Sequence, residues 1–354
     1  MKKRLLSMFL TLCTLICLVP TGVFAEGETT EIVAAKQELV DALAEDTALR
    51  SVAVQSIGPN EAEVELDLYE KMSAQVSVIK LISDIELGIC LPIDYEVTLD
   101  LNGHVLKMAD DASGSVIKIG STGNLTLIDS NPTAEHKFKV NGTDPWVLDE
   151  TGGTETVKGG IITGGTGSWI DSAGEYNTIS DDNICGGGVL IEKGGKLTMT
   201  GGNIVGCTAA GKNAYGGGVF VRIGGTFEMS GGSITGCTAV AQANYGDAYG
   251  GGIRNNGFDS DVGRTTLSGT AVIRDCHAKG ASNSIYNDYS LFGGGISDGG
   301  TLNISGGVTI IGCTAGEYKR SDAMFIYAYN DSSVTGGTFY GASRTMEVRS
   351  PASL

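Results

Sequence analysis

The sequence predicts an all-β fold, a parallel β-helix of about seven to eight coils, and three observations support this prediction. One phrase recurs four times, beginning at Cys185, Tyr215, Tyr249 and Phe292, and its first copy reads CGGGVLIEKGGKLTMTGGNIVGCTA. Short runs of alternating apolar and polar residues follow glycine pairs or triplets, as strands follow turns. The copies are too short for four-stranded propeller blades and lack the pattern of a leucine-rich repeat. One such unit cannot bury its apolar face alone, so successive copies are expected to stack.

Residues 1–25 have the pattern of a secretory signal peptide. Three basic residues come first, an apolar run extends from Leu5 to Val19, and a cleavage site ends at Ala25. The alternative is an uncleaved membrane anchor, but the run is shorter than the ~20 residues of a span. No later segment is apolar enough to cross a bilayer. We therefore expect a secreted, extracellular protein with no membrane span after signal removal, either released or associated with the cell surface.

Residues 26–75 are expected to form a helical segment that caps the open end of the stacked sheets. Apolar residues recur at helical spacing from about Glu31 to Ala44, with charged residues between them. A second stretch, Glu61 to Ala74, fits either a helix or a strand, because both spacings are present.

Residues 76–345 carry the β pattern. A polar, glycine-rich insertion occupies about 131–183, and within it VKGGIITGG, from Val157, is expected to belong to another coil. Each clear repeat is predicted to contain three strands. The length that varies between repeats lies after the cysteine and before the next glycine triplet, which places it on one flank of the stack. Residues 346–354 form a tail without a capping helix, so the chain is expected to be a fragment of a longer one.

The alternation within the repeats identifies the side chains that should face the core. Five such side chains supply about 10 kcal/mol of burial at ~2 kcal/mol each, which is less than the cost of ordering some 20 residues. Contacts between stacked repeats must therefore supply the remaining stabilisation. The core-facing side chains predicted in the first two repeats are Val189, Ile191, Leu197, Met199, Ile204, Val219, Val221, Phe227, Met229 and Ile234.

Four cysteines occupy one position of the repeat and are predicted to form a structural ladder of small buried thiols. Equivalent residues of stacked strands lie about 4.8 Å apart, but their parallel Cβ vectors do not converge to the ~3.8 Å that a disulfide prefers. No CxxC or Cys/His spacing indicates a metal site. The four residues are Cys207, Cys237, Cys276 and Cys313.

The composition excludes several classes of partner. The net charge is −17, and loss of a leader with three basic and no acidic residues makes it −20. Nucleic-acid binding is not expected, because it depends on Lys and Arg contacts to phosphates, and polyanionic substrates are disfavoured. No motif indicates a cofactor, and the sequence does not define an oligomeric state.

Two features resemble a known family. The segment LDLNGHVL, Leu99–Leu106, and the GGG, MSGG and GCTA units resemble the right-handed parallel β-helix (pectin-lyase-like) surface proteins of bacteria and, more distantly, the repeats of polymorphic outer-membrane adhesins. The likeness spans about Val76 to Tyr340, and cysteines stand where those adhesin repeats usually carry Asn. The resemblance implies a right-handed coil and an adhesive or glycan-binding surface protein, although some relatives of this fold are polysaccharide lyases or hydrolases.

Candidate catalytic and metal-binding acids are few. Asp181 and Asp182 precede the first glycine triplet and could supply acid and base if held ~5–9 Å apart; the alternative is a solvated loop. Asp259 and Asp261 are weak candidates for a metal, because D-S-D-V-G lacks the rest of a calcium loop. This paucity of convergent acids argues against an enzyme.

The histidines do not form a catalytic pattern. The chain has three, His104, His136 and His277, and none lies in the sequence context that a pectin hydrolase of this fold uses. His104 is expected to have a structural role in the LNGH turn. His277 replaces the threonine of the GCTA motif and is expected to be a variant turn residue.

Aromatic residues are the most suggestive binding feature. Tyr215, Tyr249 and Phe292 each stand directly before a glycine triplet, so they should line up along one edge, as a sugar-binding strip or as packed corner residues. Aromatic faces beside amide groups suit the C–H faces and hydroxyls of sugar rings. Three further tyrosines lie on the same flank among Asn and Asp residues and are also candidates for ligand contact, namely Tyr245, Tyr286 and Tyr289.

The sequence therefore favours a secreted or cell-surface β-helix protein with a binding or adhesive role, with a glycan or a host or cell-surface polymer as partner. The first alternative is a polysaccharide lyase or glycoside hydrolase, which would need convergent acids and a base from adjacent coils. The second alternative is a structural surface stalk.

Overall fold

The chain divides into two compact units, Met1–Arg50 and Ser51–Leu354, and the structure, a computed structural model, describes residues of the second unit. The predicted signal peptide and the predicted helix at 31–44 lie outside the described residues. The described residues are 54–56, 68–170, 183–242, 246–258, 261–280, 291–316, 322–327, 332–341 and 345–349.

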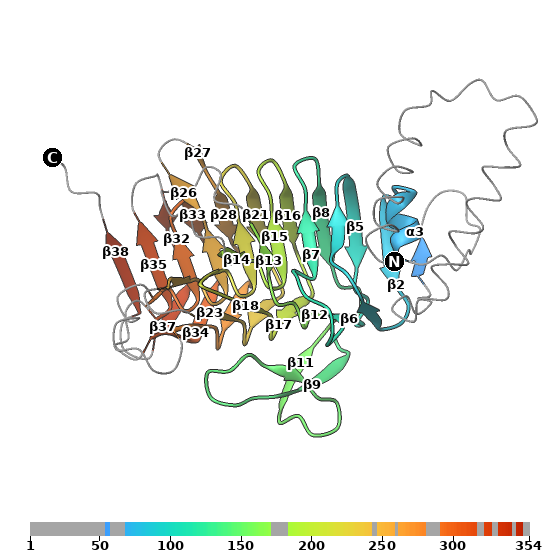
Figure 1. Ribbon diagram of the computed structural model, residues 1–354, viewed down its shortest axis with the longest axis horizontal. Helices are drawn as coiled ribbons and strands as arrows, with labels where there is room; N and C mark the ends of the chain where they lie inside the picture. Colours follow the sequence, from blue (N-terminus) through green and yellow to red (C-terminus); the bar gives the residue numbers. More distant parts are fainter. Residues whose placement is uncertain are drawn as a thin grey trace, which may run out of the picture. The chain divides into compact units, whose positions relative to one another are not determined.

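The described residues are all-β apart from helix α3 (Leu68–Ser73), and most strands pair in parallel within three long sheets (Figure 1). The all-β class and the parallel pairing predicted from the repeats are thus confirmed. Helix α3 also decides the ambiguity at 61–74 for those six residues. No helix in the described ranges is long and apolar enough to cross a membrane.

The nine-stranded sheet contains the second strand of each repeat. In spatial order its strands are β1 (Val54–Ser56), β2 (Val78–Leu81), β5 (Glu96–Asp100), β8 (Asn124–Ile128), β16 (Lys196–Met199), β21 (Thr226–Met229), β28 (Arg264–Leu267), β33 (Thr301–Ile304) and β36 (Ser333–Val334). The eight-stranded sheet contains the strand that follows each glycine triplet. Its strands are β38 (Met346–Arg349), β35 (Met324–Tyr327), β32 (Ile296–Asp298), β25 (Ile253–Asn255), β20 (Val219–Val221), β15 (Val189–Ile191), β7 (Ile117–Ile119) and β4 (Leu91–Ile93).

The eleven-stranded sheet joins the strands on either side of each cysteine. Its order is β18 (Thr208–Gly211), β23 (Thr238–Ala241), β30 (His277–Gly280), β34 (Thr309–Ala315), β29 (Val272–Arg274), β22 (Ser233–Thr235), β17 (Asn203–Val205), β12 (Ile161–Thr163), β6 (Val105–Met108) and β3 (Ile85–Leu87), and β37 (Thr338–Gly341) also pairs with β34. As expected, the VKGGIITGG segment contributes a strand, β12, which pairs in parallel with β6 and β17. Parallel pairing also extends into the predicted tail, because β38 pairs with β35.

Smaller sheets accompany these three. The five-stranded sheet contains β13 (Ser168–Trp169), β14 (Asn183–Cys185), β19 (Asn213–Tyr215), β24 (Ala248–Tyr249) and β31 (Leu291–Phe292). The insertion forms an antiparallel sheet, which we call the insertion sheet, from β10 (Val147–Leu148), β9 (Glu135–Lys139) and β11 (Glu155–Lys158). A two-stranded hairpin of the third repeat contains β26 (Gly257–Phe258) and β27 (Asp261–Val262).

The first and second repeats each contain five strands, whereas three were predicted. In the first repeat β15, β16 and β17 are the predicted strands, and β14 precedes them while β18 follows the cysteine. The two additional strands bury alanine where the others bury valine, isoleucine or leucine, for example Ala209 and Ala214. Alanine and glycine give little β-strand signal in a sequence, so these segments were expected to be insertions.

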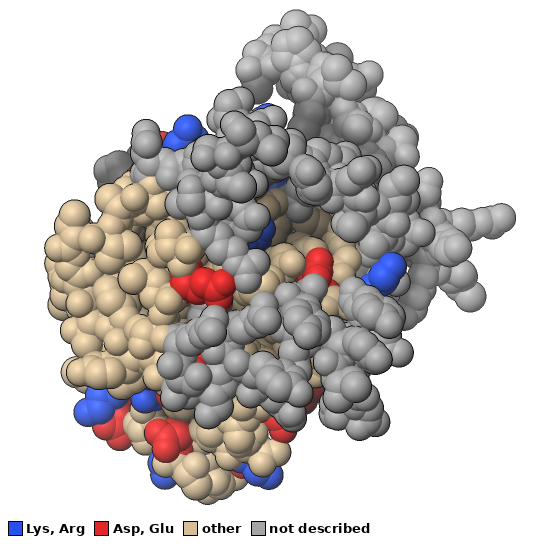
Figure 2. All heavy atoms as spheres, turned by 90° about the vertical axis from the view of Figure 1, so that its left-hand side faces the viewer, with Lys and Arg blue, Asp and Glu red and all other residues tan. Residues whose placement is uncertain are grey.

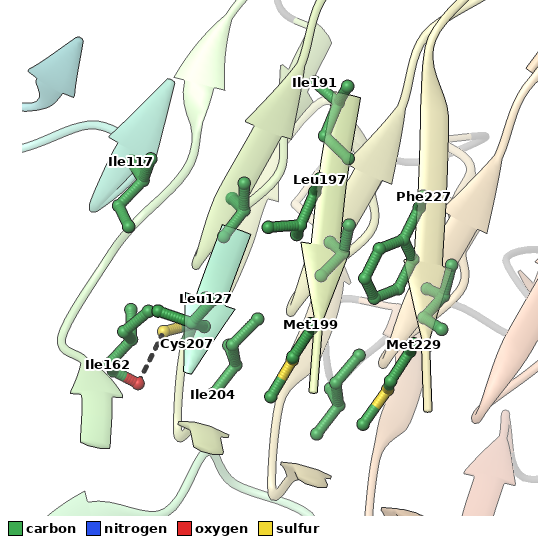
Figure 3. Packing of buried hydrophobic residues seen from close by; sticks show 14 of the residues in the cluster. Ile117, Leu127, Ile162, Ile191, Leu197, Met199, Ile204, Cys207, Phe227 and Met229 are labelled. Atoms are coloured by element: carbon green, nitrogen blue, oxygen red, sulfur yellow. Dashed lines mark hydrogen bonds between the residues drawn. The ribbon is translucent and has the colours of Figure 1, made fainter. Parts of the chain in front are cut away.

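Successive repeats align residue by residue, so that like side chains stack in columns. Val189 pairs with Val219, and Val219 pairs with Ile253, in parallel register. All ten side chains predicted to face the core are at most 1% exposed, which confirms this part of the pattern. Figure 3 shows Ile191, Leu197, Met199 and Ile204 of one repeat pointing into the same core as Phe227 and Met229 of the next.

The glycine triplets are explained by close backbone contacts. In the first triplet Gly186 has φ +59°, a left-handed conformation that favours glycine. A Cβ on Gly187 would clash with the carbonyl oxygen of Gly217 in the next repeat, and a Cβ on Gly188 would lie 3.4 Å from the sulfur of Cys207. The closest atoms to that Cβ belong to Ile204 and Gly218, so the triplet makes room for the core and for the next repeat.

The third and fourth repeats interrupt the apolar core with polar side chains. Asn255 and Asp298 take the positions of Val221 and Ile191 in one column, and both are fully buried. The side-chain amide of Asn255 donates to Asp298 Oδ1 at 2.7 Å, and the hydroxyl of Ser332 donates to Asp298 Oδ2 at 3.2 Å. Burial nevertheless raises the pKa of Asp298, because a charge is costly in an apolar core.

Truncation of Phe227 tests the columns. Phe227→Ala should lower the free energy of unfolding by about 3 to 5 kcal/mol, because it removes a fully buried ring that its stacked neighbours cannot replace. Glu228→Ala is the matched control on the same strand. The Glu228 carboxylate forms a surface ion pair with Lys196 at 2.9 Å, so this variant should change the free energy of unfolding by no more than ~0.5 kcal/mol. If the two variants lowered the free energy of unfolding equally in denaturant titrations, the stacked packing of Phe227 would be contradicted.

The buried carboxyl of Asp298 predicts a pH dependence of stability. Its pKa is higher in the folded protein than its ordinary value of 3.8, so the folded state binds more protons. The contribution of Asp298 to the free energy of unfolding should therefore be highest below that value and fall as pH rises through the folded pKa. Asp298→Asn should remove this fall in denaturant titrations across pH, and an unchanged pH profile would show that the carboxyl does not cause it.

Candidate functional site

Several residues singled out in the sequence lie where the structure gives no side-chain description. Asp261 belongs to β27, but its side chain is not described. The residues that lie outside the described ranges are Asp181, Asp182, Tyr245, Asp259, Tyr286 and Tyr289. Their proposed roles as acids, metal ligand and ligand-contacting tyrosines remain predictions.

The three aromatic residues before the glycine triplets form a column. The ring centroids of Tyr215 and Tyr249 are 5.5 Å apart, as are those of Tyr249 and Phe292, and Phe325 continues the column at 4.5 Å. The guanidinium carbon of Arg254 lies 5.2 Å from the centroid of the Tyr249 ring. Because the rings stack on one another, their faces are used for packing, which favours a structural role over a sugar-stacking strip.

The four repeat cysteines lie in the core as reduced thiols and are fully buried. The Cys207 thiol donates to the carbonyl oxygen of Ile162 at 3.9 Å, a contact drawn in Figure 3, and the Cys276 thiol donates to that of Ile234 at 3.6 Å. Burial and neighbouring thiols raise the pKa of Cys207 and Cys276 well above the usual range. Thiols that are fully enclosed by the core are inaccessible to a substrate, so this column has a packing role.

The insertion sheet docks onto the outer face of the eleven-stranded sheet through Trp146. The backbone N–H of Trp146 donates to the carbonyl oxygen of Gly236 at 3.1 Å. A Cβ on Gly236 would clash with the Trp146 ring, and a Cβ on Gly206 would clash with the Trp146 carbonyl. These glycines of the GCTA motif therefore provide the flat surface on which the insertion lies, and Figure 1 shows β9 and β11 beside β12 and β17.

A pocket lies at this junction. Its volume is about 330 Å³, within the range of small-ligand sites. The insertion supplies one wall and the third and fourth repeats supply the other. The residues that line it are Val140, Gly142, Trp146, Glu155, Asp275, His277 and Gly312.

Asp275 is the first departure of the third repeat from the consensus. It stands where the other repeats have Gly206, Gly236 and Gly312, and it keeps their left-handed conformation, with φ +52°. A side chain in this conformation costs of order 1 kcal/mol. Burial raises the pKa of Asp275; Arg274, whose Nη1 lies 3.9 Å from Asp275 Oδ2, opposes this rise and the carboxylate of Glu155 adds to it.

His277 is the second departure, and its expected role as a turn residue is wrong. It lies in strand β30, in register with Thr238 and Thr314, and is 5% exposed. Its Nδ1 lies 2.8 Å from the Thr314 hydroxyl oxygen. Burial and, to a smaller extent, the positive charge of Lys279 lower the pKa of His277 to about 4, so the imidazole is neutral at neutral pH.

Trp146 contributes an unused hydrogen-bond donor to the pocket wall. The residue is 3% exposed, and its Nε1 is buried without a hydrogen-bond partner in the described structure. Leaving such a group unpaired costs about 1 to 3 kcal/mol. The guanidinium carbon of Arg274 lies 4.7 Å from the centroid of the Trp146 ring, and Phe138 packs at 6.3 Å between centroids. The ring is thus held in place by its neighbours.

One ion pair ties the insertion to the third repeat. Lys279 Nζ lies 2.7 Å from Asp144 Oδ1, which joins β30 to the loop that carries Trp146. The hydrogen bond and charge of Lys279 lower the pKa of Asp144. This contact holds the loop against β30 and engages the Lys279 charge.

The other two histidines have structural partners. His104 Nδ1 lies 3.3 Å from Asp84 Oδ1, in agreement with the expected structural role. His136 contacts the carbonyl oxygen of Gly103 and the carboxylate of Glu150, both at 2.8 Å. The described residues contain no group of three or more His, Cys, Asp or Glu side chains arranged to hold a metal ion.

Comparison of the chain with protein-family models, with curated proteins and with solved structures finds no match. The chemistry of the pocket is therefore the guide to function. A carboxyl group, a neutral imidazole and an indole N–H are donors and acceptors suited to a small polar ligand. Sequence reasoning missed this site, although DCHA in place of GCTA marked both Asp275 and His277.

Replacement of Asp275 by the repeat's own residue tests whether this site costs stability. Asp275→Gly should raise the free energy of unfolding by about 0.5 to 1 kcal/mol, because glycine adopts a positive φ without steric cost. The reverse change in a neighbouring repeat, Gly312→Asp, should lower it. Destabilisation by Asp275→Gly in thermal or denaturant unfolding would mean that the carboxyl group stabilises the fold.

Proposed function

We propose that the stacked parallel sheets wind into a right-handed β-helix of the pectin-lyase-like type. The chain passes repeatedly from the eight-stranded to the nine-stranded and then to the eleven-stranded sheet, and the strands of each sheet pair in parallel. Three faces that recur in this order are the arrangement expected of such a coil. The leader pattern at residues 1–25 supports export, and with it a place outside the cell or on its surface.

We infer that the protein is an exported binding module that holds a glycan in the pocket beside Trp146. One observation carries this proposal: Asp275 and His277, two departures of the third repeat from the consensus, line the same pocket. One of them also adopts a backbone conformation that disfavours a side chain. Costly features that persist at a cleft are typical of functional sites.

The chemistry of the wall supports a saccharide. Sugars present hydroxyl groups that both donate and accept hydrogen bonds, and the pocket offers a carboxyl group, an imidazole nitrogen and the unpaired Trp146 Nε1. A volume of about 330 Å³ accommodates a group the size of one sugar unit. The aromatic column of Tyr215, Tyr249 and Phe292 then has a packing role.

A second candidate function, glycoside hydrolysis, is favoured by one specific observation. Asp275 and Glu155 line the same pocket, and the pKa of Asp275 is raised by burial and by the Glu155 charge. Two carboxyl groups at one cleft, one of them with a raised pKa, are the arrangement that such hydrolases use. Release of reducing ends from a bound glycan, lost in Asp275→Asn, would establish this activity in place of simple binding.

A glycan array distinguishes the binding proposal from a stalk. The purified protein should bind a defined set of glycans. The double variant Asp275→Gly, His277→Thr, which restores the repeat consensus, should weaken that binding by about tenfold or more while remaining folded. Glu228→Gln, on the nine-stranded sheet away from the pocket, is the control and should bind as the parent does. Absence of binding to any glycan, or equal binding by the double variant, would overturn the proposal.

A further inference from the structure

Acidic side chains outnumber basic ones among the residues that line the pocket. Two carboxylates, Glu155 and Asp275, line it, and each acts on the other as a like charge. Glu155 lies on the exposed strand β11 and makes no ion pair with another described residue. Figure 2 shows charged side chains of both signs along the lower edge of its view, the side on which Figure 1 places β9 and β11.

Two cations of the third repeat beside the pocket, Arg274 and Lys279, are already engaged. Lys279 is bound to Asp144 at 2.7 Å. Arg274 lies over the Trp146 ring and reaches Asp275 at 3.9 Å, which offsets part of one carboxylate charge. His277 adds no positive charge at neutral pH, because burial lowers its pKa to about 4. The groups that face a ligand therefore carry a net negative charge.

A second, independent feature belongs to the wall of the same pocket. Trp146 is 3% exposed and lines the wall, and its buried Nε1 has no partner in the described structure. A neutral hydroxyl or ring oxygen of a ligand would satisfy this donor. The pocket thus combines one donor for a neutral acceptor with two carboxylates for a positive group.

We propose that the pocket selects saccharides that carry a protonated amine. The ammonium group would lie between Asp275 and Glu155, and a sugar oxygen would accept from Trp146 Nε1. An opposite charge between two carboxylates relieves their repulsion, whereas a uronate carboxylate would add a third negative charge. This inference rests on the proposed glycan binding and names the class of glycan.

Three oligosaccharides that differ in one substituent test the proposal. The β-1,4-linked hexamers of glucosamine, N-acetylglucosamine and glucose share a backbone and differ at carbon 2. At about pH 6 and low salt, in isothermal titration calorimetry with the full protein, the glucosamine hexamer should bind about tenfold more tightly than the other two. Added salt should reduce this preference, because the contact is between charges.

Variants of the two pocket carboxylates test where the amine group binds. Glu155→Gln and Asp275→Asn should each reduce the ratio between the glucosamine and glucose hexamers several-fold, with folding checked by circular dichroism. Lys196→Gln, outside the pocket, should leave the ratio unchanged.

The outcomes separate the two proposals. Equal affinities for the three hexamers, or tightest binding of the neutral one, would overturn the amine preference while leaving glycan binding intact. Failure of all three hexamers would overturn the amine preference, and the glycan array would then decide whether glycan binding stands. If both pocket variants still preferred the glucosamine hexamer, the amine would bind elsewhere. This result would also overturn the proposal.

Discussion

Parallel, in-register stacking is the constraint on which the rest of this structure depends. Each residue of a repeat lies over the same residue of the next, so a side chain must pack against copies of itself. Aliphatic residues, small thiols and staggered aromatic rings meet this condition, because each can pack at the spacing of adjacent strands. The recurrence of the glycine triplets follows from the same condition, since Gly188 makes room for Ile204 in the core and for Gly218 of the next repeat.

A stack of identical units has a featureless surface, so a site must come from a departure. The third repeat supplies it, with Asp275 and His277 in place of glycine and threonine. The insertion converts these two changes into a pocket, because Trp146 lies on the preceding glycines and forms the opposite wall. Glycines of the preceding repeats make room for the insertion, and Asp275 and His277 line the space that it encloses, together with the consensus Gly312.

The sequence predicted those parts of the structure whose signal is local and periodic. Phe227 and Ile234 could be placed in the core because apolar residues alternate around them. The strands at 208–211 and 213–215 could not, because their buried residues are alanines with little strand preference. The docking of Trp146 on Gly236 joins residues ninety positions apart, and no local pattern reports such a contact. Asp275 and His277 were visible as irregularities, but only the position of the insertion shows that they share a pocket.

The central claim is that the repeats stack in register and that the insertion lies on their glycine column beside Asp275. A crystal structure of the protein is the most direct measurement of it. The account predicts successive Cα atoms of Cys207, Cys237, Cys276 and Cys313 about 4.8 Å apart, reduced thiols, and the Trp146 ring against Gly236. Disulfides among these cysteines, repeats folded as separate antiparallel hairpins, or an insertion that lies away from the glycine column would contradict it.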